Sequence, residues 1–216
     1  MITRILYHDR DLLLCRKPAG MPSQPDASGQ PDLLTFLQST HPTASLVHRL
    51  DTPTGGVMVF GLTPKATARL CAMVQDHETF RKEYFAVLSH TLSEETGEMR
   101  DFLYHDKKLN KSFVTDGKRK GSKEAVLSYR TLAADEQGHS LVSVRLHTGR
   151  THQIRVQFAS RGYPLVGDGR YGNREKCPHI GLWAYSLAFP HPITGKPISV
   201  ETLPDTNIYP WHLFNF

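Results

Sequence analysis

The 216-residue sequence has few cysteines and no long apolar run. Its three cysteines, Cys15, Cys71 and Cys177, are far apart and form no Cys-x-x-Cys pair, which argues against a disulfide framework or a zinc ribbon and predicts reduced, buried thiols. No segment reaches the roughly 20 apolar residues of a membrane-spanning helix, and the first residues lack the apolar core of a signal peptide. We therefore expect a soluble, cytoplasmic protein.

Cofactor and metal motifs are also missing or incomplete. The twelve histidines are scattered, whereas a zinc site needs clustered ligands with definite spacing. Gly167–Gly172 matches G-x-G-x-x-G, but too few residues follow for a dinucleotide domain, so we interpret it as a turn. His48–Asp51 resembles a kinase catalytic loop, yet no Asp-Phe-Gly accompanies it. The sequence predicts no cofactor and no metal.

Positive charge is concentrated in one segment. The net charge is +5, and 107–123 holds seven Lys or Arg against Asp116 alone. The rest of the chain is therefore close to neutral. Such a patch is typical of a phosphate-backbone contact, and a solvated hairpin or flexible insert at about 104–123 explains the charge equally well.

Hydrophobic periodicity and turn residues predict many strands and few helices. A helix at 33–38 is expected to be capped by Asp32, a second to start after Thr63 with Pro64 and run to about His77, and a third to run from Thr151 to Arg161. Strands are expected at 2–7, 12–16, 57–62, 80–89, 125–131, 141–147, 182–189 and 198–203, with a hairpin and mobile loop in 94–122.

Many strands joined by hairpin-length connections favour an α+β fold with a mostly antiparallel or mixed β-sheet and a few flanking helices. The length fits one domain, and no linker or repeat divides the chain. We therefore expect a single catalytic domain over 1–216, and a monomer is the simplest expectation.

The most informative motif is His48-Arg49-Leu50-Asp51, which runs into Thr-Pro-Thr-Gly-Gly directly before an apolar strand. In an extended or looped segment, side chains two positions apart, such as Arg49 and Asp51, can reach one cleft. A cation that binds a polyanion beside a nucleophilic or basic carboxylate is suited to chemistry on RNA.

Two later segments add an aromatic ring and a second cation. Lys82 and Tyr84 share one face of a strand, and a tyrosine there can offer a ring for base stacking and a hydroxyl for proton transfer, or be an ordinary core residue. His152 and Arg155 are one helical turn apart, and Arg155 can pair with a buried carboxylate or lie on the surface.

Several motifs in this order resemble the RluA-type RNA pseudouridine synthases. The resemblance covers nearly the whole chain, and any one motif alone is weak. The matching segments are 16–22, 48–56, 82–84, 148–155, 162–168 and 191–195.

The resemblance implies a pseudouridine-synthase-like fold with a central cleft, and uridine isomerisation in RNA without cofactor or metal. By carry-over, Asp51 is the catalytic carboxylate, Tyr84 stacks on or deprotonates the base, and Arg155 pairs with Asp51. Residues expected to contact RNA are Arg49, His48, Arg150, Gln153, Lys82, Lys118, Arg119 and Lys120.

Two departures from the family pattern are visible. Gly55 stands where many relatives have serine, which removes a local hydrogen bond but not the carboxylate. We also expect no basic N-terminal RNA-binding domain of the kind that many relatives carry, so that target selection resides in the catalytic domain.

The expected activity is isomerisation of specific uridines in ribosomal or transfer RNA. One carboxylate suffices for covalent and for elimination routes, and the sequence does not choose between them. Hydrolytic glycosidases use two carboxylates, and no second acid accompanies Asp51. The alternative is a non-catalytic RNA-binding protein that keeps the synthase fold.

Overall fold

A computed structural model describes residues 3–216. The chain divides into two compact units. The first comprises the chain up to Lys82 together with Trp183–Pro204, and the second comprises Glu83–Leu182 together with Asp205–Phe216. Each unit contains its own part of the β-structure, and the chain enters the second unit within strand β5 (Arg81–Leu88) and leaves it at the start of β10 (Leu182–Pro190).

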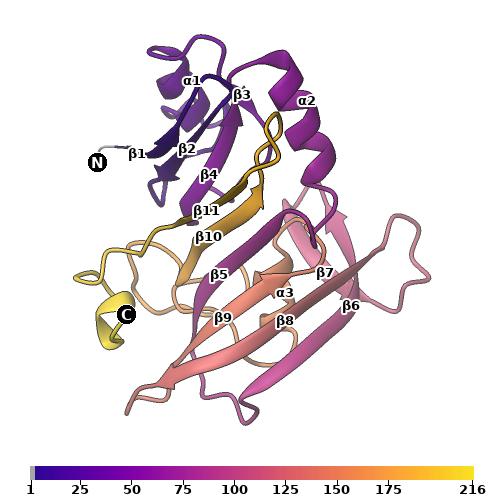
Figure 1. Cartoon of the computed structure of the whole chain (residues 1–216). Helices are drawn as coiled ribbons and strands as arrows, with labels where there is room; N and C mark the ends of the chain where they lie inside the picture. Colours follow the sequence, from indigo (N-terminus) through magenta and orange to yellow (C-terminus); the bar gives the residue numbers. More distant parts are fainter. Residues whose placement is uncertain (1–2) are drawn as a thin grey trace. The chain divides into compact units, whose positions relative to one another are not determined.

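The first unit is a mixed sheet with two helices (Figure 1). β2 pairs antiparallel with β1 and β4, β11 pairs antiparallel with β10, and β3 pairs with β4, whereas β10 and β4 are parallel. The elements not yet delimited are β1 (Arg4–His8), β2 (Leu12–Lys17), α1 (Leu33–Gln38), β3 (Ser45–Leu46), β4 (Gly55–Gly61), α2 (Pro64–Met73) and β11 (Pro197–Glu201).

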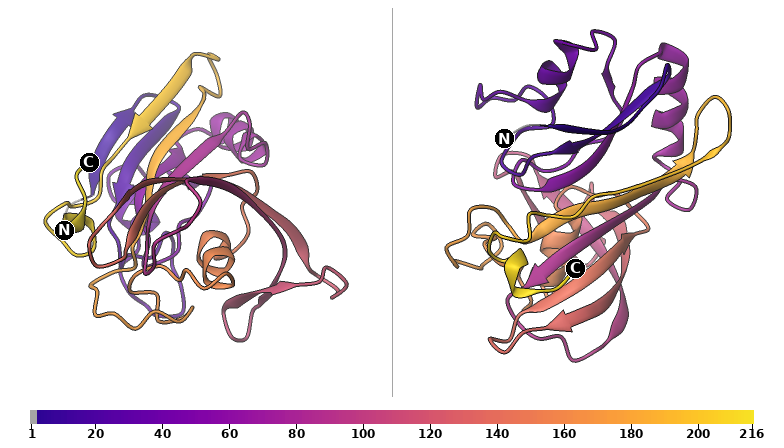
Figure 2. Two further views of the ribbon diagram at one scale, coloured as in Figure 1. Left: turned by 90° about the horizontal axis from the view of Figure 1, so that it is seen from below. Right: turned by 60° about the vertical axis from the view of Figure 1, so that its left-hand side comes forward.

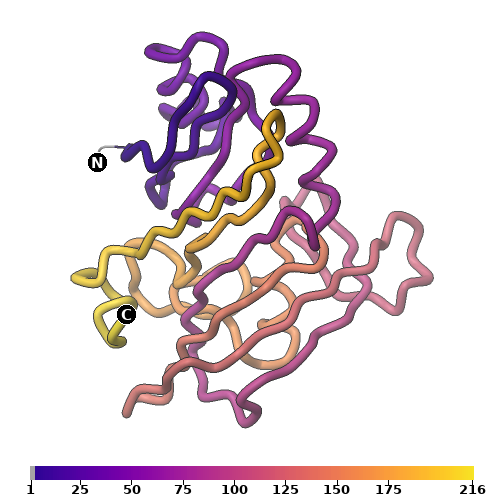
Figure 3. The backbone as a smooth tube through the Cα atoms, in the orientation of Figure 1, coloured from indigo at the N-terminus to yellow at the C-terminus, as the bar shows by residue number. Residues whose placement is uncertain are grey.

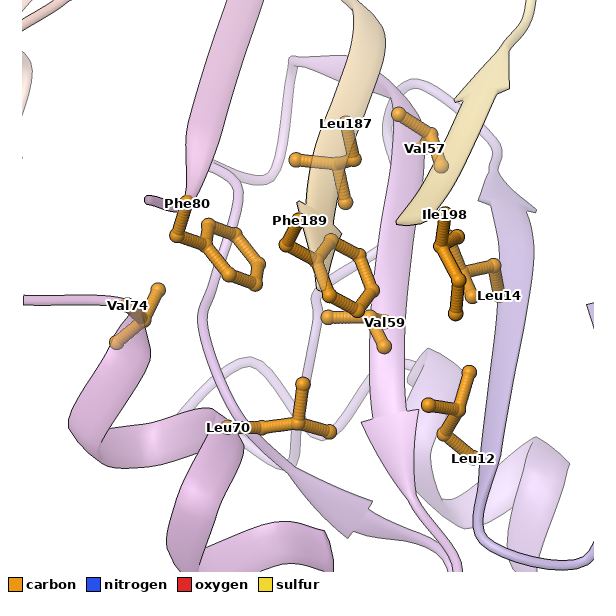
Figure 4. Packing of buried hydrophobic residues seen from close by; sticks show 10 residues of the cluster. All are labelled: Leu12, Leu14, Val57, Val59, Leu70, Val74, Phe80, Leu187, Phe189 and Ile198. Carbon is orange, nitrogen blue, oxygen red and sulfur yellow. The ribbon is translucent and has the colours of Figure 1, made fainter. Parts of the chain in front are cut away.

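The core of the first unit lies between α2 and the sheet (Figures 1 and 4). Strand β4 is buried along its whole length, as its continuous apolar sequence predicts for a central strand. Phe80 and Phe189 stack with their ring centroids 4.8 Å apart at the centre of the cluster. The ten buried residues of this cluster are Leu12, Leu14, Val57, Val59, Leu70, Val74, Phe80, Leu187, Phe189 and Ile198.

The second unit is an antiparallel sheet in the order β5-β9-β8-β6-β7. The sheet is curved, and Figure 2 shows α3 on its concave side, where the helix contacts β6 and β7. Its further elements are β6 (Thr96–Asp106), β7 (Lys111–Thr115), β8 (Lys123–Ala134), β9 (Ser140–Leu146), α3 (Gln153–Ala159) and the 3-10 helix η1 (Trp211–Leu213).

The helix caps follow the sequence signals. The Asp32 carboxylate accepts from the Thr35 amide at 2.9 Å, and the Thr63 hydroxyl accepts from the Ala66 amide, so both expected caps are confirmed. Helix α2 ends at Met73 rather than at His77, because the Asp76 carboxylate turns the chain by accepting from the amides of Glu78 and Thr79.

Other boundaries differ modestly from the expectations. Each expected strand is present, although Ile2 lies outside the described residues. All three cysteines are free, but only Cys15 is buried, since Cys71 is exposed on α2 and Cys177 is half-buried. Within residues 3–216, no helix is long and apolar enough to cross a membrane.

Candidate active site

Asp51 lies in the loop between β3 and β4, at the edge of the buried core of the first unit. The loop closes on itself through the Thr54 amide, which donates to the Asp51 carbonyl at 2.9 Å. Asp51 is half-buried and Thr54 is buried, with a hydroxyl that has no hydrogen-bond partner. The motif thus places a carboxylate on a tight turn directly before the central strand.

The 17–23 segment holds this loop at both ends of the motif. The Ser23 hydroxyl donates to the Leu50 carbonyl at 2.8 Å and accepts from the Leu50 amide at 3.1 Å. The Gly20 amide donates to the Thr52 carbonyl at 2.8 Å. Because the residues on either side of Asp51 are bonded to the same neighbouring segment, the backbone that carries the carboxylate is fixed.

Lys17 is a fully buried cation beside the Asp51 loop. Its ammonium donates to the carbonyls of Pro18 at 3.0 Å, Met21 at 2.5 Å and Thr52 at 3.2 Å. Burial lowers the pKa of Lys17 to about 7, although the negative charge of Asp51 acts in the opposite direction. The Lys17 ammonium is therefore held by three backbone carbonyls, and its charge interacts with that of Asp51.

His48 and Lys82 both lie beside the Phe80 ring. The His48 Nε2 accepts from the Val59 amide at 3.3 Å, and burial together with the Lys82 charge lowers the pKa of His48 to about 3. Its imidazole is therefore neutral. The Lys82 ammonium lies 5.8 Å from the centre of the Phe80 ring, and burial lowers the pKa of Lys82 to about 8. Arg49, between these groups in sequence, is exposed.

Gly55 is required by its surroundings. A Cβ added at Gly55 would lie 2.2 Å from the ring of Trp183, which is itself buried and donates its indole N–H to the Thr202 carbonyl at 2.7 Å. The Arg16 guanidinium lies over the same indole, with its central carbon 5.4 Å from the centre of the Trp183 ring. The space that a serine side chain would need at position 55 is therefore occupied by the Trp183 indole.

Tyr84 lies in the second unit, on strand β5, and is buried. The alternation along β5 is as expected, since Lys82, Tyr84 and Ala86 are buried, while Glu83 and Phe85 are only partly so. Burial alone is compatible both with a core tyrosine and with a ring that forms the floor of a base-binding site.

Arg155 is buried on α3 and pairs with a buried carboxylate. Its Nε donates to Asp168 Oδ2 at 2.7 Å and its Nη2 to Asp168 Oδ1 at 2.9 Å, which is the two-pronged geometry that guanidinium and carboxylate groups favour. Arg155 is 4% and Asp168 is 1% exposed, so the alternative of a surface arginine is wrong. A pairing of Arg155 with Asp51 stays a prediction.

The start of α3 differs from the expectation. His152 has a left-handed backbone (φ 55°) and precedes the first helical residue, so it does not lie one regular helical turn before Arg155. The His152 Nδ1 instead lies within hydrogen-bond distance of the Tyr171 hydroxyl, at 3.0 Å. The guanidinium carbon of Arg155 lies 5.2 Å from the centre of the Tyr171 ring. Burial raises the pKa of Tyr171, which opposes ionisation of this hydroxyl.

Gln153 and Arg150 fix the turn that leads into α3. The Gln153 side chain accepts from the Thr148 hydroxyl at 2.8 Å and from the Arg150 amide at 3.0 Å, and it donates to the Val126 carbonyl at 3.1 Å. The Arg150 Nε donates to the Glu124 carbonyl at 2.8 Å. These contacts give both residues a structural role, and their contact with RNA stays a prediction.

A group of possible metal ligands occurs in the first unit at Asp9, Asp11 and His191. Both nitrogens of His191 are already engaged, because Nε2 contacts Asp9 at 2.9 Å and Nδ1 accepts from the amides of Ile193 and Thr194. Asp9 also accepts from the Tyr7 hydroxyl and two amides. These hydrogen bonds give the cluster a structural role, because they fix the 191–195 turn and join it to Asp9.

Asp51 lies in the first unit, and Tyr84 and Arg155 lie in the second. Lys118, Arg119 and Lys120 are exposed in the loop between β7 and β8. Sequence reasoning assigned no role to Lys17 or Asp168. The available signals were a lysine that follows the apolar run of β2 and Arg16, and an acidic residue within a glycine-rich turn.

Comparison with known proteins identifies the family. The sequence model described as RNA pseudouridylate synthase matches residues 11–160, which include Asp51, Tyr84 and Arg155. This chain belongs to the RNA pseudouridylate synthase family. It is therefore an enzyme of the RNA pseudouridine synthase class, as the sequence motifs predicted.

The curated relatives support this assignment over most of the chain. The chain is 31% identical to the dual-specificity RNA pseudouridine synthase RluA of Yersinia pestis over 203 residues, which cover 90% of this chain and 95% of that protein. It is 32% identical to ribosomal large subunit pseudouridine synthase D of Zymomonas mobilis over 218 residues, which cover 91% of this chain and 68% of the relative.

A solved structure confirms the fold. Human RNA pseudouridylate synthase domain containing 1 matches with a TM-score of 0.80 at 23% identity, over 97% of this chain and 86% of that one. The predicted α+β fold, with a mostly antiparallel or mixed sheet and few helices, is thus confirmed.

Proposed function

We propose that this pseudouridine synthase isomerises specific uridines in ribosomal or transfer RNA, with Asp51 as its catalytic carboxylate. The observation that carries the proposal is the fixed backbone of the loop that holds Asp51. Its loop is bonded to the 17–23 segment through Ser23 and Gly20, and a buried lysine lies beside it. A carboxylate on a fixed backbone beside a buried charge is suited to act on a substrate atom, because positioning is a large part of catalysis.

The proposed reaction is balanced within the substrate. The bond between uracil N1 and ribose C1′ breaks, the detached uracil rotates, and a bond between C5 and C1′ forms, while C5 loses a proton and N1 gains one. The Asp51 carboxylate either attacks C1′ or removes the C2′ proton, and in both routes it is released unchanged. Neither route needs a redox partner, a metal or a cofactor.

Tyr84 and Arg155 are assigned supporting catalytic roles. Tyr84 offers its ring to the extruded base or its hydroxyl to the proton at C5. The role proposed for Arg155 is supported by its buried position and by its two hydrogen bonds to Asp168, which hold the guanidinium in one orientation.

The proposed RNA contacts divide into two classes. Arg49 and the cations Lys118, Arg119 and Lys120 are exposed and suited to phosphate groups. His48, Lys82, Gln153 and Arg150 are buried or half-buried, so any contact with RNA would involve the target nucleotide after it leaves its stack. A monomer acting in the cytoplasm is the simplest form of the proposal.

The proposal is tested on RNA from cells that lack the gene. Purified wild-type protein and its Asp51→Asn variant are incubated with this RNA, and pseudouridines are mapped by carbodiimide adducts and reverse-transcription stops. We expect new stops with the wild type alone, which would also identify the target RNA. Circular dichroism and RNA binding of the variant serve as controls for folding.

The rival function is RNA binding without catalysis. This function predicts no new reverse-transcription stops with either protein on any cellular RNA, while the affinity for RNA remains intact. Equal stops with both proteins would instead retain the activity and remove Asp51 from its catalytic role.

A further inference from the structure

The hairpin of β6 and β7 exposes aromatic side chains on one face. Tyr104 and Phe113 are directly opposite each other in the antiparallel register, and Phe102 is two residues before Tyr104, so the three side chains share a face. Phe102 is 43% exposed, and Tyr104 and Phe113 are partly exposed. We call Phe102, Tyr104 and Phe113 the aromatic face.

The opposite face of the hairpin is the one that contributes to the core. Leu103 is 4% and Ser112 is 1% exposed, and the Ser112 hydroxyl donates to the Thr151 carbonyl at 2.6 Å. Leu103 packs with Ala125 and Val156. Packing in the core therefore explains the alternate residues of β6 and β7, whereas Phe102 and Tyr104 lie beside the 116–122 connection, at Gly117 and Gly121.

Cations already lie on the rings of the aromatic face. The guanidinium carbon of Arg119 is 3.5 Å from the centre of the Tyr104 ring, and the Lys111 ammonium is 5.7 Å from the centre of the Phe113 ring. Arg119 belongs to the 116–122 connection, which extends beyond the strands that it joins (Figure 3). A guanidinium stacked on a tyrosine forms a flat platform that presents positive charge at its rim.

Charge around the aromatic face favours a polyanion. The 107–123 segment carries seven Lys or Arg against one acid. The nearest acid on the neighbouring strand is Glu124, opposite Phe102, and it is paired with Arg100 at 2.7 Å. An apolar surface for a protein or lipid partner would not require so many cations beside the rings.

We propose that the aromatic face binds unpaired bases of the RNA that flank the target uridine, while Lys111 and the 118–120 cations bind the adjoining phosphates. Aromatic rings and arginine planes stack on exposed bases, and every base offers a suitable face. Bases within a duplex are already stacked, so the platform selects single-stranded segments. The proposal rests on RNA being the substrate, but it does not depend on the role of Asp51.

The test uses a short single-stranded RNA that carries one 2-aminopurine, with the same RNA in a duplex as the comparison. Tyr104→Leu and Phe113→Leu are each expected to lower the affinity for the single strand by roughly 5- to 150-fold, the effect of losing one stacked base. The 2-aminopurine fluorescence, which is quenched on stacking, should recover in the same variants. Duplex affinity should change little.

Two control variants separate stacking from charge and from general surface effects. Phe36→Leu removes an aromatic ring that is 51% exposed on α1 of the other unit, and it should leave single-strand affinity unchanged. Lys118→Gln should reduce the dependence of affinity on salt, whereas Tyr104→Leu and Phe113→Leu should lower affinity without changing that dependence.

The proposal is overturned if the aromatic variants bind the single strand as tightly as the wild type does, which would leave the face to a protein partner. Pseudouridine formation on cellular RNA is measured in parallel at limiting protein, where Tyr104→Leu and Phe113→Leu should lower the yield together with the affinity, and Phe36→Leu should retain it. A wild-type protein that shows aromatic-dependent binding but forms no pseudouridine would support the platform and contradict the proposed activity.

Discussion

The two units each bury a cation, and they stabilise it in different ways. In the first unit, the Lys17 ammonium is held by three backbone carbonyls. In the second unit, the Arg155 guanidinium is held by two bonds to the Asp168 carboxylate. Carbonyl dipoles stabilise a charge without neutralising it, whereas a carboxylate supplies an equal and opposite charge in place.

This difference assigns different tasks to the two cations. The Lys17 charge is not neutralised by its hydrogen-bond partners, which is consistent with its lowered pKa of about 7 and with its electrostatic interaction with Asp51. The Arg155 charge is matched by Asp168, which fixes the guanidinium in orientation. Lys17 is therefore suited to influence a carboxylate electrostatically, and the Arg155–Asp168 pair is suited to hold a geometry.

The largest expected effect concerns the charged pair. Asp168→Asn removes the buried negative charge that pairs with the Arg155 guanidinium through two hydrogen bonds, so the free energy of unfolding should fall by about 3 kcal/mol or more. Urea denaturation of the wild type and the variant measures this change.

A double variant shows whether the loss of stability in Asp168→Asn comes from the buried charge of Arg155. Arg155→Met combined with Asp168→Leu removes both charges and keeps similar volumes, so it should recover most of the lost stability. If the double variant is as unstable as Asp168→Asn, the pair is needed for packing rather than for charge balance.

The second prediction concerns the cation held by carbonyls. Lys17→Met keeps the length of the side chain but removes three hydrogen bonds, of which the one to the Thr52 carbonyl joins the Asp51 loop to the 17–23 segment. We expect kcat to fall by about 10- to 100-fold because the carboxylate is misplaced. RNA affinity should be unchanged, since Lys17 is fully buried. A matched loss of affinity and kcat would instead indicate an RNA contact.

The third prediction concerns the strand that follows the Asp51 loop. Gly55→Ser introduces a side chain into space that the Trp183 ring fills, and stability should fall by about 1 to 3 kcal/mol. Trp183→Leu should reduce this penalty when the two changes are combined. Thermal melts of the two single variants and the double variant give the coupling, and strictly additive losses would mean that the ring is not the obstacle.

The smallest expected effect is the dependence of stability on pH. The pKa of Lys17 is about 7 in the folded protein and 10.5 ordinarily, so between these values the unfolded chain binds more protons than the folded one. Stability due to Lys17 should therefore rise with pH, by about 1 kcal/mol between pH 7 and 8. The difference in stability between the wild type and Lys17→Met measures this rise, and a difference that stays flat over this range would contradict the shifted pKa.

Much of the fold could be predicted because its signals are local. Asp32 before an apolar helix, Thr63 followed by proline, and the alternation or continuous apolarity of the strands each report on a few neighbouring residues. The chain's turn into α3 was predicted less well, because His152 has a left-handed backbone and its ring contacts Tyr171, nineteen positions later in the sequence. The end of α2 was set by a side-chain turn at Asp76.

The candidate site was predictable in its motif residues and not in their partners. Asp51, Tyr84 and Arg155 were assigned to the site because the family motifs include them, and their roles stay predictions. Lys17 and Asp168 act through burial and through contacts distant in sequence, and neither property is visible in a single sequence without a known fold. Gly55 shows the same limitation, since only the position of Trp183 explains why a side chain is excluded there.

The most direct test of the account is the single-turnover rate of Asp51→Asn on the RNA identified by mapping. Protein is in excess over RNA, and binding of the same RNA is measured in parallel. The account predicts that the variant binds the RNA with wild-type affinity and forms no pseudouridine over the time in which the wild type completes its turnover. Product formed by Asp51→Asn at a rate near that of the wild type would contradict the central role of this carboxylate.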